Sequence, residues 1–483
     1  MTEVAELARS RESEAELAPF FIQGKLVEGS DVVHRSRDLG VNFATPALDL
    51  NSLILPRMQE GPLFDVPLKE IVDFLVESGE RIARPGNPFM ESCIERMSQT
   101  NVLPLRVIKN QMGLAGQMLG RSILMDVVEQ NFPDPRVLDE WVPREDRGGR
   151  KGYVRAFPPR LVHVLPGNAA VAAVQSIAWA AMVKSVNLFK MGSSDPFTAV
   201  AILRTMAEID PDHPVVRSMS AVYWRGGDEA IERTLYRPQY FDKIVAWGGG
   251  DAINNVVKYL GPGFQLVSFD PKTSISMIGR EALVSEARIA DAAERTARDV
   301  SILNQEACVA SRIVFIEGET PEVDRFCERL IERIGVDRDN CSAEAPPLDR
   351  ALVEEIEALQ LMDDEFRVWG LGSGKGLVVR SDQPVDFHPI NKTANVVRVK
   401  ALEDALRYVN VATQTVGVYP FERSFALRDR LASGGAQRVT RLGDCGGGCA
   451  GNPHDATYPL HRFVHWVAHE DGWTDERDPL PPA

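Results

Sequence analysis

The chain has 483 residues, of which 44% are hydrophobic and 25% charged, and its formal net charge is −15. This length predicts two or three domains, and the composition is that of a soluble globular protein. The acidic balance argues against a general nucleic-acid binder, yet it leaves room for a local basic pocket around a phosphorylated ligand.

Membrane insertion and secretion are not expected either. No uncharged apolar run approaches the roughly 20 residues that a membrane span needs. The acidic N-terminus, MTEVAELARSRESEAELAPF, lacks the apolar core of a secretory signal. Six cysteines are too few for a disulfide scaffold in so long a chain, so we expect reduced thiols and a cytoplasmic protein.

The predicted elements alternate regularly from about residue 160. Residues 1–154 carry amphipathic helical patterns and are expected to pack on the lobe that follows. Helices between short apolar strands indicate right-handed βαβ units, and thus a parallel, Rossmann-type dinucleotide-binding lobe over 155–271. The expected strands cover 161–165, 186–190, 221–225, 243–247 and 265–269, and the expected helices cover 169–184, 195–209, 228–235 and 251–260.

A second, catalytic α/β lobe is predicted over 272–415. A long helical pattern opens it, and strands and helices then alternate again. The expected helices cover 286–303, 321–334, 352–361 and 402–410, and the expected strands cover 312–316, 376–380 and 394–399. The predicted fold class is therefore α/β, with two lobes and a cleft between them.

Three local features are candidates for chemistry. The first is the run Gly248, Gly249 and Gly250, between strand 243–247 and a helix. Glycines let the backbone approach a phosphate closely, and the free N–H groups at a helix start favour its charge. The alternative interpretation is a tight strand-to-helix turn without a ligand.

The second feature is Asn168, in the segment LPGNAA at the carboxyl end of the first parallel strand. Open α/β sheets bind ligands at that end. Asn168 either caps the following helix or points its amide at a developing oxyanion.

The third feature is Cys308, which ends a polar NQEAC step between a helical and a strand pattern. A buried cysteine is usually an inert small hydrophobe. The polar flank and the position at the junction of the lobes favour a nucleophile instead.

A zinc site is the rival interpretation of the C-terminal segment. Cys445, Cys449, His461 and His465 give a C-x3-C-x11-H-x3-H spacing, close to that of a two-cysteine, two-histidine site. The segment between them lacks the apolar residues of a zinc finger and holds two prolines. A glycine-rich loop over the cleft is preferred, and no metal is assigned.

Taken in order, these pieces resemble the aldehyde dehydrogenase superfamily over about residues 155–450. The segment 165–199 looks like that superfamily's strand, Asn, helix and strand ending in Lys. KIVAWGGG looks like its glycine turn under the pyrophosphate, and NQEAC looks like its catalytic Gln-x-Cys region. FDPKTSISMIG and HDATYPLHRFVHWV resemble the LuxC-type acyl-CoA reductases, the branch that makes fatty aldehyde in bacterial luciferase systems. The resemblance implies a two-lobed aldehyde-dehydrogenase-like fold in which residues 416–483 return to the first lobe and form a homo-oligomer.

The resemblance also implies an activity, the NADPH-dependent reduction of a long-chain acyl thioester to the free aldehyde. Cys308 would be the acylated nucleophile, and Asn168 and the Cys308 backbone N–H would hold the oxyanion. No His or Lys neighbours Cys308 in the sequence; His388 and His454 are the candidates to keep the thiol ionised if the fold brings one of them close, and this assignment stays open. Lys392 is a candidate ribose ligand. The expected partners are acyl-CoA or an acyl-carrier thioester, and an acyl-transferring or aldehyde-consuming enzyme.

The cofactor site is expected around Pro166, Lys190, Ser193 and the glycine run. Lys190 ends the second strand, where the adenosine ribose lies in the resembled fold. NAD-preferring relatives tend to carry Glu at the position of Ser193, and an acidic side chain there would repel a 2′-phosphate. Ser193 and the charge of Lys190 therefore favour NADPH over NADH.

Oxidation of a free aldehyde with NAD(P) is the alternative activity, and a catalytically silent scaffold is the third interpretation. Oxidising dehydrogenases carry a Glu that activates water, whereas DPKTSISMIG has no carboxylate after Asp270. A reductase must protect its acyl-enzyme from hydrolysis until hydride arrives, so this loss favours reduction. The sequence alone does not specify the acyl chain, the donor or the oligomeric state.

Overall fold

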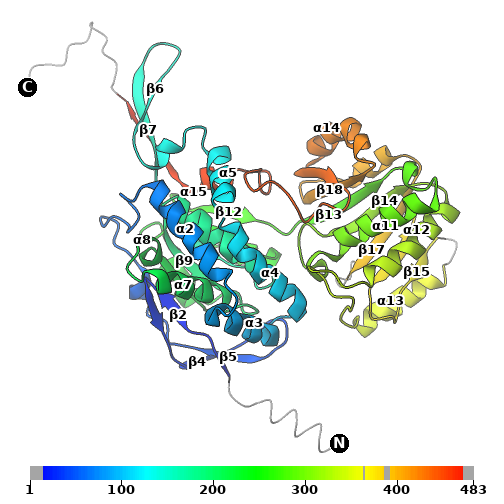
Figure 1. Ribbon diagram of the computed structural model, residues 1–483, viewed down its shortest axis with the longest axis horizontal. Coiled ribbons are helices and arrows are strands. Elements are labelled where there is room, and N and C mark those ends of the chain that lie inside the picture. Colours follow the sequence, from blue (N-terminus) through cyan, green and yellow to red (C-terminus); the bar gives the residue numbers. More distant parts are fainter. Residues whose placement is uncertain (1–14, 363–364, 386–391, 471–483) are drawn as a thin grey trace, which may run out of the picture.

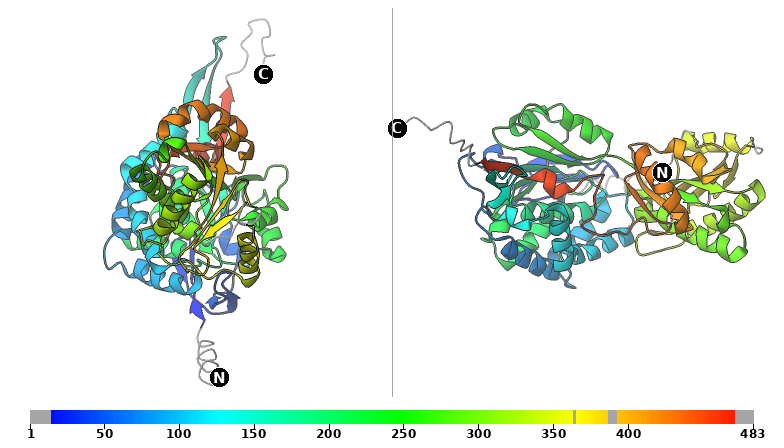
Figure 2. Two further views of the ribbon diagram at one scale, coloured as in Figure 1. Left: turned by 90° about the vertical axis from the view of Figure 1, so that its right-hand side faces the viewer. Right: turned by 90° about the horizontal axis from the view of Figure 1, so that it is seen from above.

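The computed structural model describes residues 15–362, 365–385 and 392–470. Two lobes lie side by side, the first built mainly from the blue to green part of the chain and the second from the green to orange part (Figure 1). The lobes also lie side by side when the molecule is seen from above (Figure 2). Among the described residues, no helix is long and apolar enough to cross a membrane.

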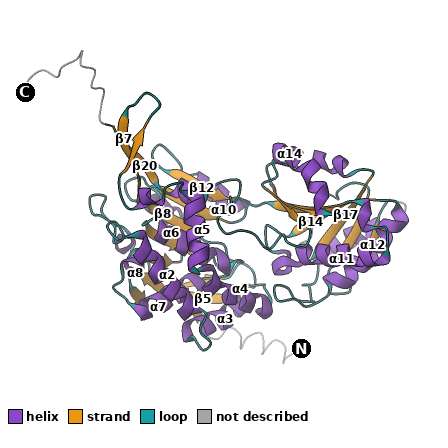
Figure 3. Ribbon diagram, turned by 45° about the horizontal axis from the view of Figure 1, so that its top comes forward, coloured by secondary structure: helices purple, strands orange, loops and turns teal. Residues whose placement is uncertain are grey.

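A seven-stranded sheet forms the centre of the first lobe, in the order β12-β11-β8-β9-β10-β2-β3. The strands from β12 to β10 are parallel, and β2 and β3 add antiparallel strands from the N-terminal segment. β8 to β11 are almost wholly buried, as is typical of a parallel sheet packed against helices (Figure 3). The strands are β2 (Phe20–Ile22), β3 (Lys25–Val27), β8 (Arg160–Val164), β9 (Val186–Lys190), β10 (Met219–Val222), β11 (Lys243–Trp247) and β12 (Gln265–Phe269).

The helices of the N-terminal segment pack on the helices of this first lobe. In α2, Ile71, Val72 and Leu75 are fully buried at the spacing of one helix face, which explains why the segment docks. The helices of the first lobe are α2 (Leu68–Ile82), α3 (Pro88–Thr100), α4 (Leu105–Met118), α5 (Arg121–Asn131), α6 (Ala170–Met182), α7 (Thr198–Ile209), α8 (Pro214–Arg217), α9 (Glu229–Leu235), α10 (Gly250–Val257) and α15 (Pro459–Phe463).

Two small sheets extend the first lobe. One joins β1 (Glu16–Leu17), β5 (Asn42–Thr45) and β4 (Val32–Arg35). The other joins β6 (Val142–Glu145), β7 (Lys151–Phe157) and β20 (His465–Glu470), and it projects from the body as an arm (Figure 1). The C-terminal segment thus returns to the first lobe, and every residue of β20 is exposed.

The second lobe is built on a second seven-stranded sheet, in the order β15-β16-β17-β14-β13-β18-β19. All neighbours are parallel except β15 and β16. The elements are β13 (Thr273–Ile278), α11 (Glu286–Ser301), β14 (Ser311–Glu317), α12 (Thr320–Ile334), α13 (Arg350–Gln360), β15 (Arg367–Trp369), β16 (Leu377–Ser381), β17 (Thr393–Val399), β18 (Thr413–Tyr419), α14 (Ser424–Gly434) and β19 (Arg438–Arg441). The α/β class with two lobes is confirmed.

The elements of the second lobe differ from the sequence prediction. The expected helix over 402–410 is a 3-10 helix, η5 (Leu402–Tyr408). The strands β13, β15, β18 and β19 and the helix α14 were not predicted. β13 is buried although it contains Ser274 and Ser276, because their hydroxyls are hydrogen-bonded inside the lobe. The second sheet therefore ends at Arg441, and residue 415, the expected limit of the lobe, falls inside β18.

Candidate active site

Cys308 lies where the chain turns from the first helix of the second lobe into its central strand. After α11, a short 3-10 helix, η4 (Ile302–Gln305), leads to Cys308, and β14 begins three residues later. The Ser274 hydroxyl on β13 donates a hydrogen bond to the Cys308 carbonyl oxygen at 2.8 Å. Cys308 as a residue is exposed to solvent, although the groups packed around its thiol partly desolvate it, so a substrate carbonyl can reach this turn.

The turn before Cys308 is strained and firmly anchored. Leu303, Asn304 and Gln305 have φ of 50°, 52° and 71°, a region that costs a non-glycine residue roughly 1–3 kcal/mol. The Gln305 amide exchanges hydrogen bonds with the Thr393 backbone, at 2.7 and 2.8 Å, and the Asn304 side chain accepts one from Ser342 N at 2.8 Å. The Asn and Gln of the NQEAC step therefore hold the loop in shape rather than contact the sulfur.

The side chain that does contact the sulfur is Gln414, on β18. Its Nε2 donates to Cys308 Sγ at 3.2 Å and to Asp455 Oδ1 at 2.9 Å. Burial raises the pKa of the Cys308 thiol and the Asp455 carboxylate adds to the rise, while the Gln414 amide and the backbone N–H groups of Cys308 and Val309 lower it. Sequence reasoning missed Gln414, because nothing in the strand TQTVGVY distinguishes it from a structural polar residue.

His454 lies near this site, but its surroundings disfavour the protonated form that would keep the thiol ionised. Its ring packs edge-on against Trp247 and Phe269, at 5.4 and 5.1 Å between centroids, and also against Trp179. Burial lowers its pKa, so the imidazole is neutral at physiological pH. His388, the other residue expected to ionise the thiol, lies outside the described residues.

Asn168 approaches the catalytic loop from the first lobe. Its Nδ2 donates to the carbonyl oxygen of Glu306 at 3.3 Å and to the Glu306 carboxylate at 3.2 Å. It does not cap the next helix, because Ala169 holds the N-cap position of α6 and no side chain caps it. The structure thus brings Asn168 to a residue two positions before Cys308, with an amide directed at the loop that carries the sulfur.

A cavity of about 900 Å³ lies at the carboxyl ends of β8 to β11. Pro166, Lys190, Ser193, Gly248 and Gly249 all line it, and Gly250 begins helix α10 next to it. Burial lowers the pKa of Lys190 to about 8, and its ammonium lies 5.7 Å from the Tyr223 ring centroid.

The cavity is cationic although the chain as a whole is acidic. Arg35, the last residue of β4, Arg37, in the turn after it, and Arg225, after β10, join Lys190 in its lining. No Asp or Glu is among the described residues that form it, and Arg37 pairs with Asp38 beside it at 3.0 Å. This arginine-bearing hairpin was missed in the sequence, since β4 and β5 are short, β4 is largely exposed, and both lie far from the Rossmann pattern. The residues fit a nicotinamide dinucleotide, because glycines, a helix start and cations line one cavity.

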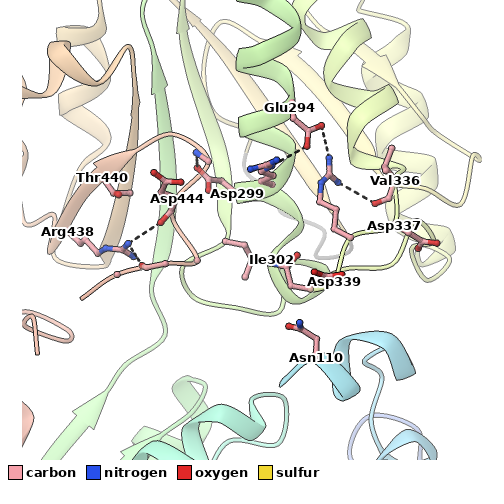
Figure 4. Close-up of a pocket in the computed structure, with 17 residues that line it drawn as sticks. Asn110, Glu294, Asp299, Ile302, Val336, Asp337, Asp339, Arg438, Thr440 and Asp444 are labelled. Atoms are coloured by element: carbon pink, nitrogen blue, oxygen red, sulfur yellow. Dashed lines mark hydrogen bonds and ion pairs between the residues drawn. The ribbon is translucent and has the colours of Figure 1, made fainter. Parts of the chain in front are cut away.

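A second cavity of about 950 Å³ opens between the lobes, lined by α11, the segment 336–340, the loop 443–448 and Asn110 of the first lobe (Figure 4). Its arginines have partners already: Arg298 and Arg338 pair with Glu294. Arg438 donates to the carbonyl oxygens of Cys445 at 2.8 Å, of Asp444 at 3.1 Å and of Gly447. The charges of this cavity therefore fix the glycine-rich loop in place and do not form an anion site.

The buried Asp299 also binds the glycine-rich loop 443–448. It accepts from the backbone N–H of Gly443 at 2.7 Å and of Cys445 at 2.9 Å, and burial raises its pKa to about 6. Cys445 is buried beside Asp299, whereas Cys449 is exposed.

The other residues of the zinc pattern lie elsewhere. His461 contacts Phe132 and Trp466, and His465 lies 3.3 Å from Asp242. In the part of the chain that the structure describes, no group of three His, Cys, Asp or Glu could hold a metal ion.

Lys392 is not available as a ribose ligand. Its side chain is buried, and its ammonium donates to the carbonyl oxygens of Ser342 and Ala343, both at 2.7 Å. Residues 386–391, just before it, lie outside the described residues.

Comparison with known proteins identifies the family. The sequence model of the family described as acyl-CoA reductase (LuxC) matches residues 63–466. The chain belongs to this family. Its fold is also that of solved aldehyde dehydrogenases, from which it differs widely in sequence, and the expected aldehyde-dehydrogenase-like fold is confirmed.

Two curated relatives illustrate the likeness within the LuxC family. The long-chain acyl-protein thioester reductase of Photorhabdus laumondii is 32% identical over 472 residues, which cover 93% of this chain and 92% of that protein. The protein of the same name from Vibrio harveyi is 28% identical over 426 residues, which cover 87% of this chain and 86% of that protein.

Three solved structures share the fold of this LuxC-family chain. The NAD-dependent aldehyde dehydrogenase from Sinorhizobium meliloti has a TM-score of 0.71 at 13% identity and covers 97% of this chain and 96% of its own. The NAD-dependent benzaldehyde dehydrogenase from Corynebacterium glutamicum has a TM-score of 0.69 at 16% identity, covering 96% and 98%. The NADP-dependent glyceraldehyde-3-phosphate dehydrogenase from Bacillus halodurans, complexed with NADP, has a TM-score of 0.68 at 14% identity, covering 94% and 98%.

Proposed function

We propose that this chain reduces a long-chain acyl thioester to the free aldehyde with NADPH, through an S-acyl intermediate on Cys308. The observation that carries the proposal is an accessible cysteine whose sulfur accepts from the Gln414 amide of its own lobe, while the Asn168 amide of the other lobe donates to Glu306, two residues before the cysteine. The names of the curated relatives support the reaction class, and acyl-CoA or an acylated carrier protein is the donor.

Acyl transfer to Cys308 follows from the residues around it. The sulfur attacks the thioester carbonyl, a new C–S bond forms, and the bond to the donor sulfur breaks, so that the donor leaves as a thiol after taking up a proton. During the attack, the Asn168 amide gives up its hydrogen bond to the Glu306 carboxylate and donates to the developing oxyanion instead. A neutral amide is suited to this role because it stabilises the oxyanion without quenching the nucleophile.

NADPH would supply the hydride that reduces the acyl-enzyme. The 900 Å³ cavity supports a cofactor with a 2′-phosphate, since Lys190, Arg35, Arg37 and Arg225 line it without any carboxylate. Once the acyl carbon is reduced, Cys308 leaves as a thiolate and the aldehyde is free.

The alternative, water-dependent oxidation of an aldehyde, lacks its usual base. The strand β13, where the resembled dehydrogenases would bring a Glu, presents the Ser274 hydroxyl to the Cys308 loop. The two carboxylates near the loop, Glu306 and Asp455, each accept a hydrogen bond from a side-chain amide. These contacts favour an acyl-enzyme that waits for hydride rather than one that is hydrolysed.

Intact-protein mass spectrometry tests the proposal. Mixed with a long-chain acyl-CoA and no NADPH, the wild type should gain one acyl mass, which added NADPH should remove as aldehyde. Cys308→Ala should bind NADPH and gain no mass. Cys449→Ala is the matched control, because Cys449 is the other exposed cysteine, and this variant should behave as wild type. An adduct that persists in Cys308→Ala would place the nucleophile elsewhere.

A further inference from the structure

Gln414 is the one side chain that donates a hydrogen bond to the reacting sulfur among the residues that the structure describes. It is 5% exposed and lies on β18, between β13 and β19 in the sheet. Its Nε2 to Cys308 Sγ distance of 3.2 Å is short for a donor to sulfur. The contact joins the turn before β14 to β18, and the two residues are 106 positions apart in the sequence.

Asp455 determines which end of the Gln414 amide faces the sulfur. A side-chain amide has two nearly equal ends, and the oxygen end would not stabilise a thiolate. The Asp455 carboxylate only accepts hydrogen bonds, and it takes one from the same Nε2 at 2.9 Å. In the flipped amide, the Gln414 Oε1 would face the Asp455 carboxylate oxygen, and the two would repel each other. On the other side of the amide, Oε1 has no hydrogen-bond partner among the described residues, so no acceptor there would favour the flip.

Asp455 is itself held by an unusual backbone. Asp455 and Ala456 have φ of 48° and 60°, and such positions persist only where the surroundings impose them. His454 and Thr457 close the turn with backbone hydrogen bonds of 2.8 and 3.1 Å, and the His454 ring is inserted among aromatic side chains of the first lobe. The first lobe thus positions Asp455, and Asp455 positions the amide on the sulfur of the second lobe.

We propose that Gln414 is a catalytic residue that stabilises the Cys308 thiolate, and that Asp455 is its positioning residue. The inference rests on the proposed function, in which Cys308 is the nucleophile. The charged groups that interact with the sulfur are the Asp455 carboxylate and the Arg312 guanidinium. Glu306 interacts with Arg312, and the neutral His454 lies 3.7 Å from Asp455. The Asp455 carboxylate by itself disfavours the thiolate, so its benefit comes through the amide that it orients.

The test measures the rate of Cys308 alkylation by iodoacetamide against pH, with the Cys308 peptide quantified by mass spectrometry. Gln414→Met keeps the length of the side chain and removes the donor, and Gln414→Glu replaces the donor by a negative charge. The alkylation pKa should rise from wild type to Gln414→Met and further to Gln414→Glu. At neutral pH, both alkylation and acyl-enzyme formation should slow by roughly 10- to 100-fold in Gln414→Met, the effect of losing a hydrogen bond to a charged group.

Gln437→Met is the matched control, because Gln437 donates to the Val411 carbonyl oxygen and to no cysteine. It should leave the profile unchanged. Thermal unfolding and NADPH binding should report that each variant is folded. If a folded Gln414→Met kept the wild-type pKa and acylation rate, the catalytic role would be overturned. If the wild type itself formed no acyl adduct on Cys308, the proposed function would fail instead, so the two failures are distinguishable.

A double-mutant cycle tests Asp455. In the Gln414→Met background, Asp455→Asn removes only a negative charge and should lower the Cys308 pKa. With Gln414 present, Asp455→Asn also removes the carboxylate that orients the Gln414 amide. The Cys308 pKa should then fall less than in the Gln414→Met background, or rise. Equal shifts in both backgrounds would show that Asp455 acts as a charge alone and would overturn its positioning role.

Discussion

Cofactor affinity should depend on pH through Lys190. This side chain lines the cofactor cavity with 9% of its surface exposed, and burial lowers its pKa to about 8. Only the charged form attracts phosphate, so affinity for NADPH is full below this pKa and falls as the pH rises through it. With a pKa of about 8, the dissociation constant at about pH 9 should be roughly ten times that at about pH 7.

Titration of the wild type with NADPH and with NADH, followed by cofactor fluorescence between about pH 7 and pH 9, measures this effect. Phosphate monoesters titrate near pH 6, below that range. Lys190→Arg is the control, since a guanidinium stays charged throughout and should abolish the dependence. A constant affinity for NADPH in the wild type would refute the reasoning. An equal dependence for NADPH and NADH would place Lys190 at the pyrophosphate rather than at the 2′-phosphate.

Three further predictions concern other residues. Ser193→Glu should lower the ratio of kcat/KM for NADPH over NADH by roughly tenfold or more, because a carboxylate repels the 2′-phosphate; the same loss in Ser193→Gln would point to crowding instead. Glu306→Ala should speed acyl-enzyme formation by roughly a few-fold, because the Glu306 carboxylate, 3.2 Å from Asn168 Nδ2, competes with the substrate oxygen for that amide. Slower acylation would assign Glu306 a direct role. A chain truncated after residue 464 lacks the exposed strand β20, which is part of the arm, and should form a smaller oligomer than the full chain in light scattering. An unchanged mass would exclude the arm as an oligomer contact.

The first lobe could be predicted closely because its strands are short, apolar and separated by helices. Strand 243–247 is buried along its whole length as β11, so its sequence carries the pattern without interruption. Ser274, Gln414 and Thr415 interrupt the pattern of β13 and β18, and these strands were missed. The Ser274 hydroxyl and the Gln414 amide are buried because they contact Cys308, and the Thr415 backbone N–H donates to that Ser274 hydroxyl; only the tertiary structure reveals these contacts.

The candidate site could be predicted only in part, for a related reason. Cys308 and Asn168 stand out because each follows a recognisable element. The arginines of the β4–β5 hairpin and the Gln414–Asp455 pair reach the site from segments with no local signal. His454 was suggested as the ionising base, yet its aromatic surroundings keep it neutral, and burial of this kind is invisible in a sequence.

The cofactor cavity and the surroundings of the Cys308 sulfur differ in their charge. Several cations line the cofactor cavity, whereas the sulfur has a neutral amide in contact with it, the Asp455 carboxylate nearby and a single guanidinium, that of Arg312, whose charge interacts with it. A cation in direct contact with Cys308 would lower its pKa further but would also weaken it as a nucleophile, because nucleophilicity falls with pKa. A thiolate must also leave at the end of the reaction, and a lower pKa favours that step. One amide at 3.2 Å is a compromise, since it stabilises the thiolate modestly both when it forms and when it departs.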